Sequence, residues 1–114
     1  MANAFLSETQ AGIGLTPVTV YTCPASTQTT IIGLSVANVT AAGIKVDVIL
    51  DASGRTSGAE DSVYLVKAAP IPTGGSLVAV GGDQKVIMEP GDIVTVTSDT
   101  AASADVHMSH LDIT

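Results

Sequence analysis

The sequence is short of aromatic residues, cysteine and basic residues, and each shortage argues against a class of function. One Phe, two Tyr and no Trp occur among 114 residues, which counts against a sugar-binding surface built from stacked aromatic rings. The single cysteine, Cys23, excludes an internal disulfide, and we interpret it as a small buried side chain rather than a reactive thiol. Four scattered basic residues stand against eleven acidic ones, so no basic stripe exists for nucleic acid or an anionic membrane surface.

Long apolar runs are also missing. No segment approaches the roughly 20 consecutive apolar residues that a transmembrane helix needs. Residues 1–10 have neither the basic region nor the apolar centre of a secretory signal peptide. We therefore expect a soluble chain made in a reducing compartment, with neither nucleic acid nor membrane as a partner.

What the sequence does contain is a series of short apolar runs separated by turn residues, among them eleven Gly and five Pro. In residues 44–50 every second position is apolar (Ile44, Val46, Val48 and Leu50), and Lys45 and Asp47 are expected to point outward. This period of two is typical of a strand with one buried face. We predict an all-β domain over residues 17–114, an antiparallel β-sandwich or jelly roll of about eight strands. The expected strands are 17–23, 30–38, 43–51, 62–67, 76–80, 85–88, 92–98 and 105–114.

Two of these strands carry more specific expectations. In residues 30–38 the alternation places Ile32, Leu34 and Val36 on the buried face. Gly33 and Ser35 belong to the opposite face.

The last expected strand changes the phase of its apolar residues. Val106 and Met108 share one phase, whereas Leu111 and Ile113 share the other. The change near Ser109 predicts either a bulge, or a strand whose two faces are both covered at an edge or an interface.

The N-terminal third of the chain is almost uncharged, because 36 residues without a charge separate Glu8 from Lys45. We read residues 1–16 as an extended N-terminal arm with no strand partner within the chain. Its apolar residues are more numerous than a frayed, solvated end requires. Interface cores are depleted in charge, so we expect the arm to pack on a partner together with apolar residues of the last strand. The hypothesised interface residues are Phe5, Leu6, Ile13, Leu15, Leu111 and Ile113.

The most conspicuous acidic corner is the sequence Glu89-Pro90-Gly91-Asp92. It fits a type II turn, because Pro presets φ at the first corner position and Gly accepts a positive φ at the second. Side chains that flank such turns are usually exposed, so we interpret the two carboxylates as parts of a solvated corner and not as a site.

Metal and catalytic sites are not expected. His107 and His110 are three residues apart, which places them on opposite faces of a regular strand. The bulge expected near Ser109 could bring them onto one face, which leaves zinc as an alternative. Beyond Asp105 or Asp112 no third zinc ligand is in reach. The polar loop 51–61 resembles a calcium loop only faintly and lacks its spacing, so we expect a surface loop. Nucleophile, base and oxyanion groups do not assemble from these residues, and we expect no enzyme and no cofactor.

Several linked blocks of the sequence resemble small virion structural proteins of tailed bacteriophages. The blocks, in order, are the N-terminal "ETQAGIGLTP", then "IIGLSVAN", "YLVKAAPIPTGGSL", "EPGDIVTVTS" and the C-terminal "HLDIT". Together they span almost the whole chain.

The resemblance implies a β-sandwich that assembles in many copies and brings no catalytic residues. We expect a capsid decoration (cement) protein on the virion surface, made in the cytoplasm of the host bacterium. Its expected partners are the major capsid protein and copies of itself, as a trimer or dimer. A tail, neck or baseplate component is the alternative within this class. A carbohydrate-binding β-sandwich on the virion is the alternative from another class.

Overall fold

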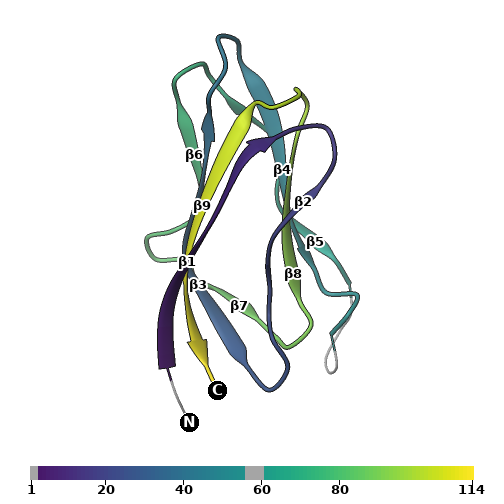
Figure 1. The fold of residues 1–114 in the computed structure, drawn as a ribbon, viewed down its shortest axis with the longest axis vertical. Coiled ribbons are helices and arrows are strands. Elements are labelled where there is room, and N and C mark those ends of the chain that lie inside the picture. The colour runs from purple at the N-terminus through teal and green to yellow at the C-terminus, as the bar shows by residue number, and fades with distance from the viewer. Residues whose placement is uncertain (1–2, 56–60) are drawn as a thin grey trace.

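The computed structural model describes residues 3–55 and 61–114, and within them it shows an all-β fold of nine strands in two antiparallel sheets. Figure 1 shows the two sheets facing each other, with both termini at one end of the molecule. The predicted antiparallel sandwich is thereby confirmed. No helix in the described part of the chain is long and apolar enough to span a membrane. The strands are β1 (Asn3–Ile13), β2 (Val18–Thr22), β3 (Gln28–Asn38), β4 (Ile44–Asp51), β5 (Val63–Ile71), β6 (Ser76–Val80), β7 (Val86–Met88), β8 (Ile93–Ser98) and β9 (Ala104–Ile113).

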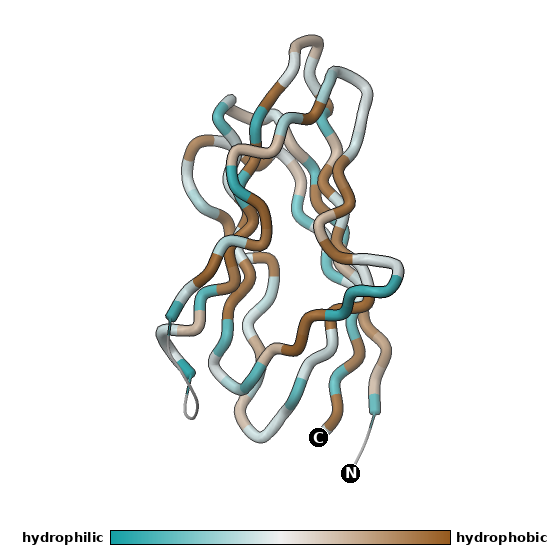
Figure 2. The backbone as a smooth tube through the Cα atoms, turned by 180° about the vertical axis from the view of Figure 1, so that it is seen from behind, coloured by the Kyte–Doolittle hydropathy of each residue, from teal (hydrophilic) through white to brown (hydrophobic). Residues whose placement is uncertain are grey.

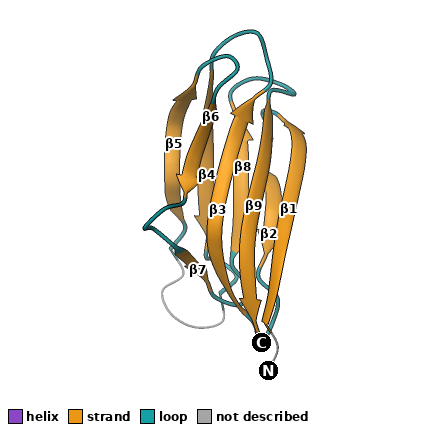
Figure 3. Ribbon diagram, turned by 90° about the vertical axis from the view of Figure 1, so that its left-hand side faces the viewer, coloured by secondary structure: helices purple, strands orange, loops and turns teal. Residues whose placement is uncertain are grey.

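The first sheet, sheet A, has the order β1-β9-β3-β6, with β7 pairing β3 as well. The second sheet, sheet B, has the order β2-β8-β4-β5. The eight expected strands correspond to β2 to β9. The ninth strand of the described residues, β1, lies in the segment that we expected to be an arm. Figure 3 shows it at one edge of sheet A, running beside β9.

The core lies between the sheets and is almost entirely aliphatic, as the scarcity of aromatic residues requires. Figure 2 shows the hydrophobic stretches along the strands of both layers. In β4 the predicted alternation is confirmed, since Val46 and Val48 are buried whereas Lys45 is exposed. Two methionines, Met88 and Met108, are fully buried in this core, where their flexible side chains can fill irregular gaps.

In β3 the expected core face is wrong at one position. Ile31, Leu34 and Val36 are buried, whereas Ile32 is only half-buried. The register between β3 and β9 shifts between Ile31 and Gly33. An extra residue in one strand reverses the alternation beyond it, so Ile31 takes the core position that we expected for Ile32.

A bulge does occur near Ser109, because the register between β3 and β9 shifts there. Its extra residue lies in β3, however, and β9 itself alternates without interruption from Ala104 to Ile113. The face that carries Val106 and Met108 continues with His110 and Asp112, which are both buried. The apolar phase therefore changes because polar residues occupy the inner face, not because the strand bulges. The half-buried Leu111 and Ile113 face outward from the sandwich.

The N-terminal segment is a strand of the domain. From Asn3 to Gln10 it pairs residue by residue with β9, and a shift in register precedes Ile13. The expectation that the arm has no strand partner within the chain is therefore wrong. Residues 1 and 2 of the expected arm lie outside the described residues.

Candidate functional site

β1 is an edge strand whose two faces are both open to solvent. Nine of the ten residues from Asn3 to Gly12 are exposed, and the exception, Glu8, is half-buried. Phe5 is 77% exposed and Leu6 is 44% exposed. An edge strand that contributes a single buried side chain at its end adds little to the core of its own domain. Its apolar residues are therefore available to a partner.

The outer face of sheet A carries an apolar row that starts on β1. Phe5 lies opposite Leu111 of β9, Leu111 lies opposite Thr30 of β3, and Thr30 lies opposite Ile87 of β7. Residues directly opposite in an antiparallel pair share a face of the sheet. Phe5 and Ile87 are exposed and the two residues between them are half-buried. Ile113 lies two residues beyond Leu111 on the same face.

The six residues of the hypothesised interface fall into different places. Phe5, Leu111 and Ile113 lie on the outer face of sheet A, whereas Leu6 lies opposite His110 on the other face. Leu15 is 66% exposed, in the connection beyond the far end of β1. Ile13 is fully buried in the core of the domain, so no partner can reach it, and it is removed from the set.

A buried polar cluster fastens β1 to the sandwich. His110 is fully buried, and its Nε2 lies 3.1 Å from a carboxylate oxygen of Glu8 while its Nδ1 lies 2.9 Å from Oδ1 of Asp112. A carboxylate can only accept, so both bonds form together when both ring nitrogens carry a proton. Glu8 is the one charged residue before Lys45, and its place beside His110 explains why it is there.

The cluster continues from Asp112 into the end of sheet B. The Tyr21 hydroxyl donates to Oδ2 of Asp112, and Thr29 Oγ1 donates to Oδ1 at 2.7 Å. The Tyr21 ring also lies against the His110 ring, with 4.1 Å between centroids. Burial opposes ionisation of Asp112, but the hydrogen bonds from Tyr21, Thr29 and His110 outweigh it and lower the pKa of this carboxyl. Burial and the bond to Asp112 raise the pKa of Tyr21.

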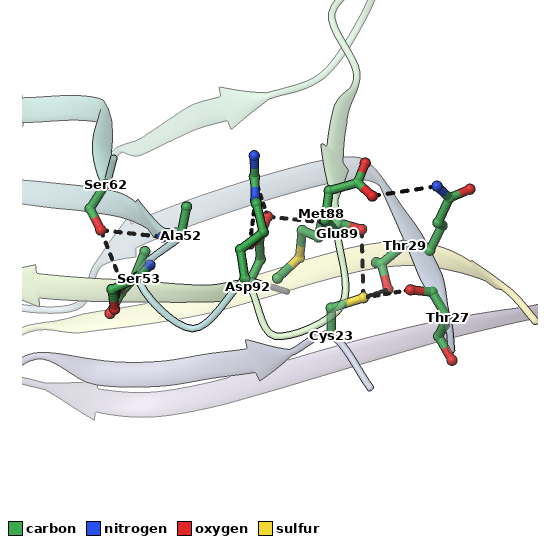
Figure 4. A network of polar contacts seen from close by, with 12 residues as sticks. Cys23, Thr27, Thr29, Ala52, Ser53, Ser62, Met88, Glu89 and Asp92 are labelled. Atoms are coloured by element: carbon green, nitrogen blue, oxygen red, sulfur yellow. Dashed lines mark hydrogen bonds and ion pairs between the residues drawn. The ribbon is translucent and has the colours of Figure 1, made fainter. Parts of the chain in front are cut away.

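Cys23 lies at the inner end of this cluster. Its thiol is buried, and it contacts the carbonyl oxygens of Thr27 and Met88 at 3.3 and 3.5 Å. Figure 4 shows these contacts, together with the one from Thr29. Burial raises the pKa of the thiol above its ordinary value, which keeps it protonated and unreactive. The prediction of a small, buried cysteine side chain is confirmed.

The lowered pKa of Asp112 predicts acid sensitivity. A carboxyl whose pKa is lower in the folded than in the unfolded state stabilises the fold above its unfolded pKa, and this contribution is lost as the pH falls through the folded pKa. We expect the wild-type free energy of unfolding to fall as the pH drops below the ordinary Asp value of 3.8. Asp112→Asn should be less stable at neutral pH and should lose less on acidification, as measured by urea unfolding at a series of pH values. Thr29→Val, which removes one donor to Asp112, should lie between them, and parallel acid profiles for all three proteins would contradict the assignment.

The acidic corner is a type II turn, as predicted, but one of its carboxylates is not solvated. Gly91 has a φ of +92°, and the amide of Asp92 donates to the carbonyl oxygen of Glu89 at 3.0 Å. The Asp92 side chain is fully buried and pairs with Arg55 through two bonds of 3.0 and 2.6 Å. It also accepts from the Glu89 amide. The expectation that Asp92 is exposed is wrong, because Arg55 reaches it from the β4–β5 loop.

Among the described residues no group of three or more His, Cys, Asp and Glu side chains is arranged to hold a metal ion. His107 is exposed and His110 is buried, on opposite faces of β9, as expected for a regular strand. A shallow depression of about 330 Å³ beside His107 also includes Asp105, but this carboxylate accepts a bond from the Gly12 amide at 3.0 Å. Glu60 of the loop 51–61 lies outside the described residues, as do the rest of residues 56–60.

The sequence could not reveal the Glu8–His110–Asp112 cluster directly, because its members come from opposite ends of the chain. Two features of the sequence agree with this cluster. Glu8 is a lone charge in an uncharged segment, and His110 and Asp112 continue the inward phase of Val106 and Met108.

Comparison with known proteins shows similarity of fold alone. No protein-family model matches the chain, and no curated protein matches it significantly. The chain is similar to a solved structure of Bacillus endospore appendages, described as a novel family of disulfide-linked pili. The TM-score is 0.55 at 16% sequence identity, and the match covers 99% of this chain and 87% of that chain.

Proposed function

We propose that this chain is a non-catalytic structural subunit of a tailed-phage virion, and within the virion a head decoration protein. It binds across neighbouring major capsid subunits and to copies of itself, and so adds contacts that resist internal pressure. Many copies that act together supply an avidity that one small domain lacks. The sequence blocks that resemble virion structural proteins supply the biological setting of this proposal.

The observation that carries the proposal is the exposure of β1 and the apolar row beside it. A domain that acted alone would gain nothing from placing Phe5 and Ile87 in water. A subunit that covers them on assembly removes apolar surface from water, at roughly 25 cal/mol per Å². Apolar surface near a sheet edge is where protein partners commonly dock.

The fold similarity to a pilus protein supports the broader proposal that this chain is a subunit that assembles with copies of itself. The disulfide linkage of that pilus protein does not carry over to this chain. The one cysteine, Cys23, is 2% exposed and contacts backbone carbonyl oxygens in the interior. Copies of this chain therefore associate without covalent links between them.

The test is the copy number of the protein in purified virions. A number comparable to that of the major capsid protein is expected for a decoration protein, as measured by quantitative mass spectrometry. Particles that lack the protein should burst at a lower temperature, and adding back the purified chain should restore the wild-type value. A handful of copies per particle would assign the chain to the neck, tail or baseplate. Absence from the particle would overturn the proposal.

A further inference from the structure

The strands at the edges of the two sheets differ in how well they are protected against pairing with another chain. An edge strand presents unpaired N–H and C=O groups, and natural proteins block such edges with short strands, lysines, prolines and irregularities. Sheet B shows these devices on both sides. β5 carries Lys67 and Pro70, a positive φ at Ala68, and two shifts of register against β4. β2 has five residues and a register shift after Thr19.

On the side of sheet A away from β1, the edge strands are protected because they are short. β6 has five residues and β7 has three, and both pair with β3. The register between β6 and β3 also shifts, after Leu34. A strand from another molecule would find only short and interrupted stretches of backbone on this side.

β1 has few of these devices. It is 11 residues long, contains no Lys, Arg or Pro, and keeps an uninterrupted register from Asn3 to Gln10. Its one charged side chain, Glu8, is turned to His110. In an antiparallel ladder alternate residues direct their backbone groups away from the partner strand, so β1 presents an uncharged, regular edge on the side away from β9.

We propose that β1 of one copy pairs with β1 of a second copy, antiparallel and about a twofold axis, so that two copies of sheet A become one continuous sheet. A second copy is the occupant because, among the described strands, its β1 is the long edge that lacks protecting devices. The β2, β5, β6 and β7 edges of that copy all carry them. An isologous pair of this kind is also self-complementary and closes.

The pairing deepens the assembly proposed above and gives the apolar row a role. Phe5 is at the outer edge of the row, so the twofold axis brings the rows of both copies into one sheet. The net charge of −7 per copy opposes association, yet Glu8, which bonds to His110, is the one charge on β1. The repulsion therefore acts least at this edge.

The test uses the full chain and two double variants in analytical ultracentrifugation. Wild type is expected at twice the 11.4 kDa mass of the monomer. Phe5→Lys with Ser7→Lys places two exposed charges on the β1 edge and should give a monomer at concentrations where wild type is dimeric. The matched control is Ser76→Lys with Val78→Lys, which changes two exposed residues with the same spacing on β6 and should remain dimeric. Both variants lower the net negative charge equally, so charge repulsion between whole molecules cannot explain a difference.

A second measurement does not depend on the variants folding. Hydrogen exchange of wild type should show amides between Asn3 and Gln10 that become protected as the concentration rises through the dimerisation range. Protection elsewhere with β1 unchanged, or loss of the dimer in the β6 variant alone, would overturn the proposal. If the protein is a monomer in solution and β1 becomes protected only on virions, the proposal is overturned. β1 then pairs with a strand of the capsid protein, and the virion role stands. A β1 dimer that is absent from virions would refute the virion role and leave the pairing.

Discussion

Ile13→Ala is expected to lower the free energy of unfolding by about 2–5 kcal/mol, the usual range when a buried Ile is truncated. The side chain is fully buried in the core. Its carbonyl oxygen accepts a bond from the Ser103 amide at 2.9 Å, and the neighbouring Gly14 carbonyl accepts one from Ser98 at 2.9 Å. The backbone at Ile13 and Gly14 is therefore held in place and can relax little into the cavity that truncation would leave. Thermal and urea unfolding followed by circular dichroism measure the loss.

Phe5→Ala is the matched control, in the same strand. It removes a larger side chain, but one that is 77% exposed, so the stability of the monomer should change by less than about 0.5 kcal/mol. Together the two substitutions test whether the end of β1 that carries Ile13 contributes to the core while the end that carries Phe5 does not. If Ile13→Ala left the fold as stable as wild type and abolished association instead, the residue would belong to an interface after all.

The fold could be predicted from the sequence wherever one face of a strand is buried against the other sheet. In β4 the aliphatic residues and Lys45 sort by face, and this local alternation is all that a strand prediction needs. β1 escapes the same reasoning because it is exposed on both faces, so its residues carry no alternation. Its partner, β9, lies at the other end of the chain. Pairing of that kind leaves no local trace in the sequence.

The errors at single residues have the same origin. A regular alternation through β3 places Ile32 inside, whereas the register shift against β9 reverses the alternation. Asp92 was expected in water because turn residues usually are, whereas Arg55, 37 positions away, pairs with it. Both outcomes depend on contacts between distant segments. Of the hypothesised interface residues, Phe5 and Leu6 are exposed and Leu111 is half-buried, whereas Ile13 is fully buried.

The corner between β7 and β8 depends on Gly91 for two independent reasons. Its φ of +92° lies in a region that side chains rarely adopt. A Cβ placed there would overlap the carbonyl oxygen of Gly54 and lie 2.9 Å from its carbonyl carbon. The corner also bonds to the end of β2, since the Gly91 amide donates to the Cys23 carbonyl at 3.0 Å. The turn thus joins the β4–β5 loop, β2 and β8.

Gly91→Ala is therefore expected to destabilise the fold far more than Gly82→Ala. Gly82 also has a positive φ, of +62°, but a Cβ there meets no atom within 4 Å, so its substitution should cost only the backbone strain of about 1–2 kcal/mol. At Gly91 the strain of about 1–3 kcal/mol is joined by a clash of about 1–3 kcal/mol or more, because backbone atoms cannot move aside as a flexible side chain would. Urea unfolding of both variants measures the difference. Equal losses would mean that the approach of Gly54 to Gly91 does not constrain the corner. A larger loss for Gly91→Ala, with Arg55→Met less stable than wild type as well, would show that the loop and the turn are held together as one unit.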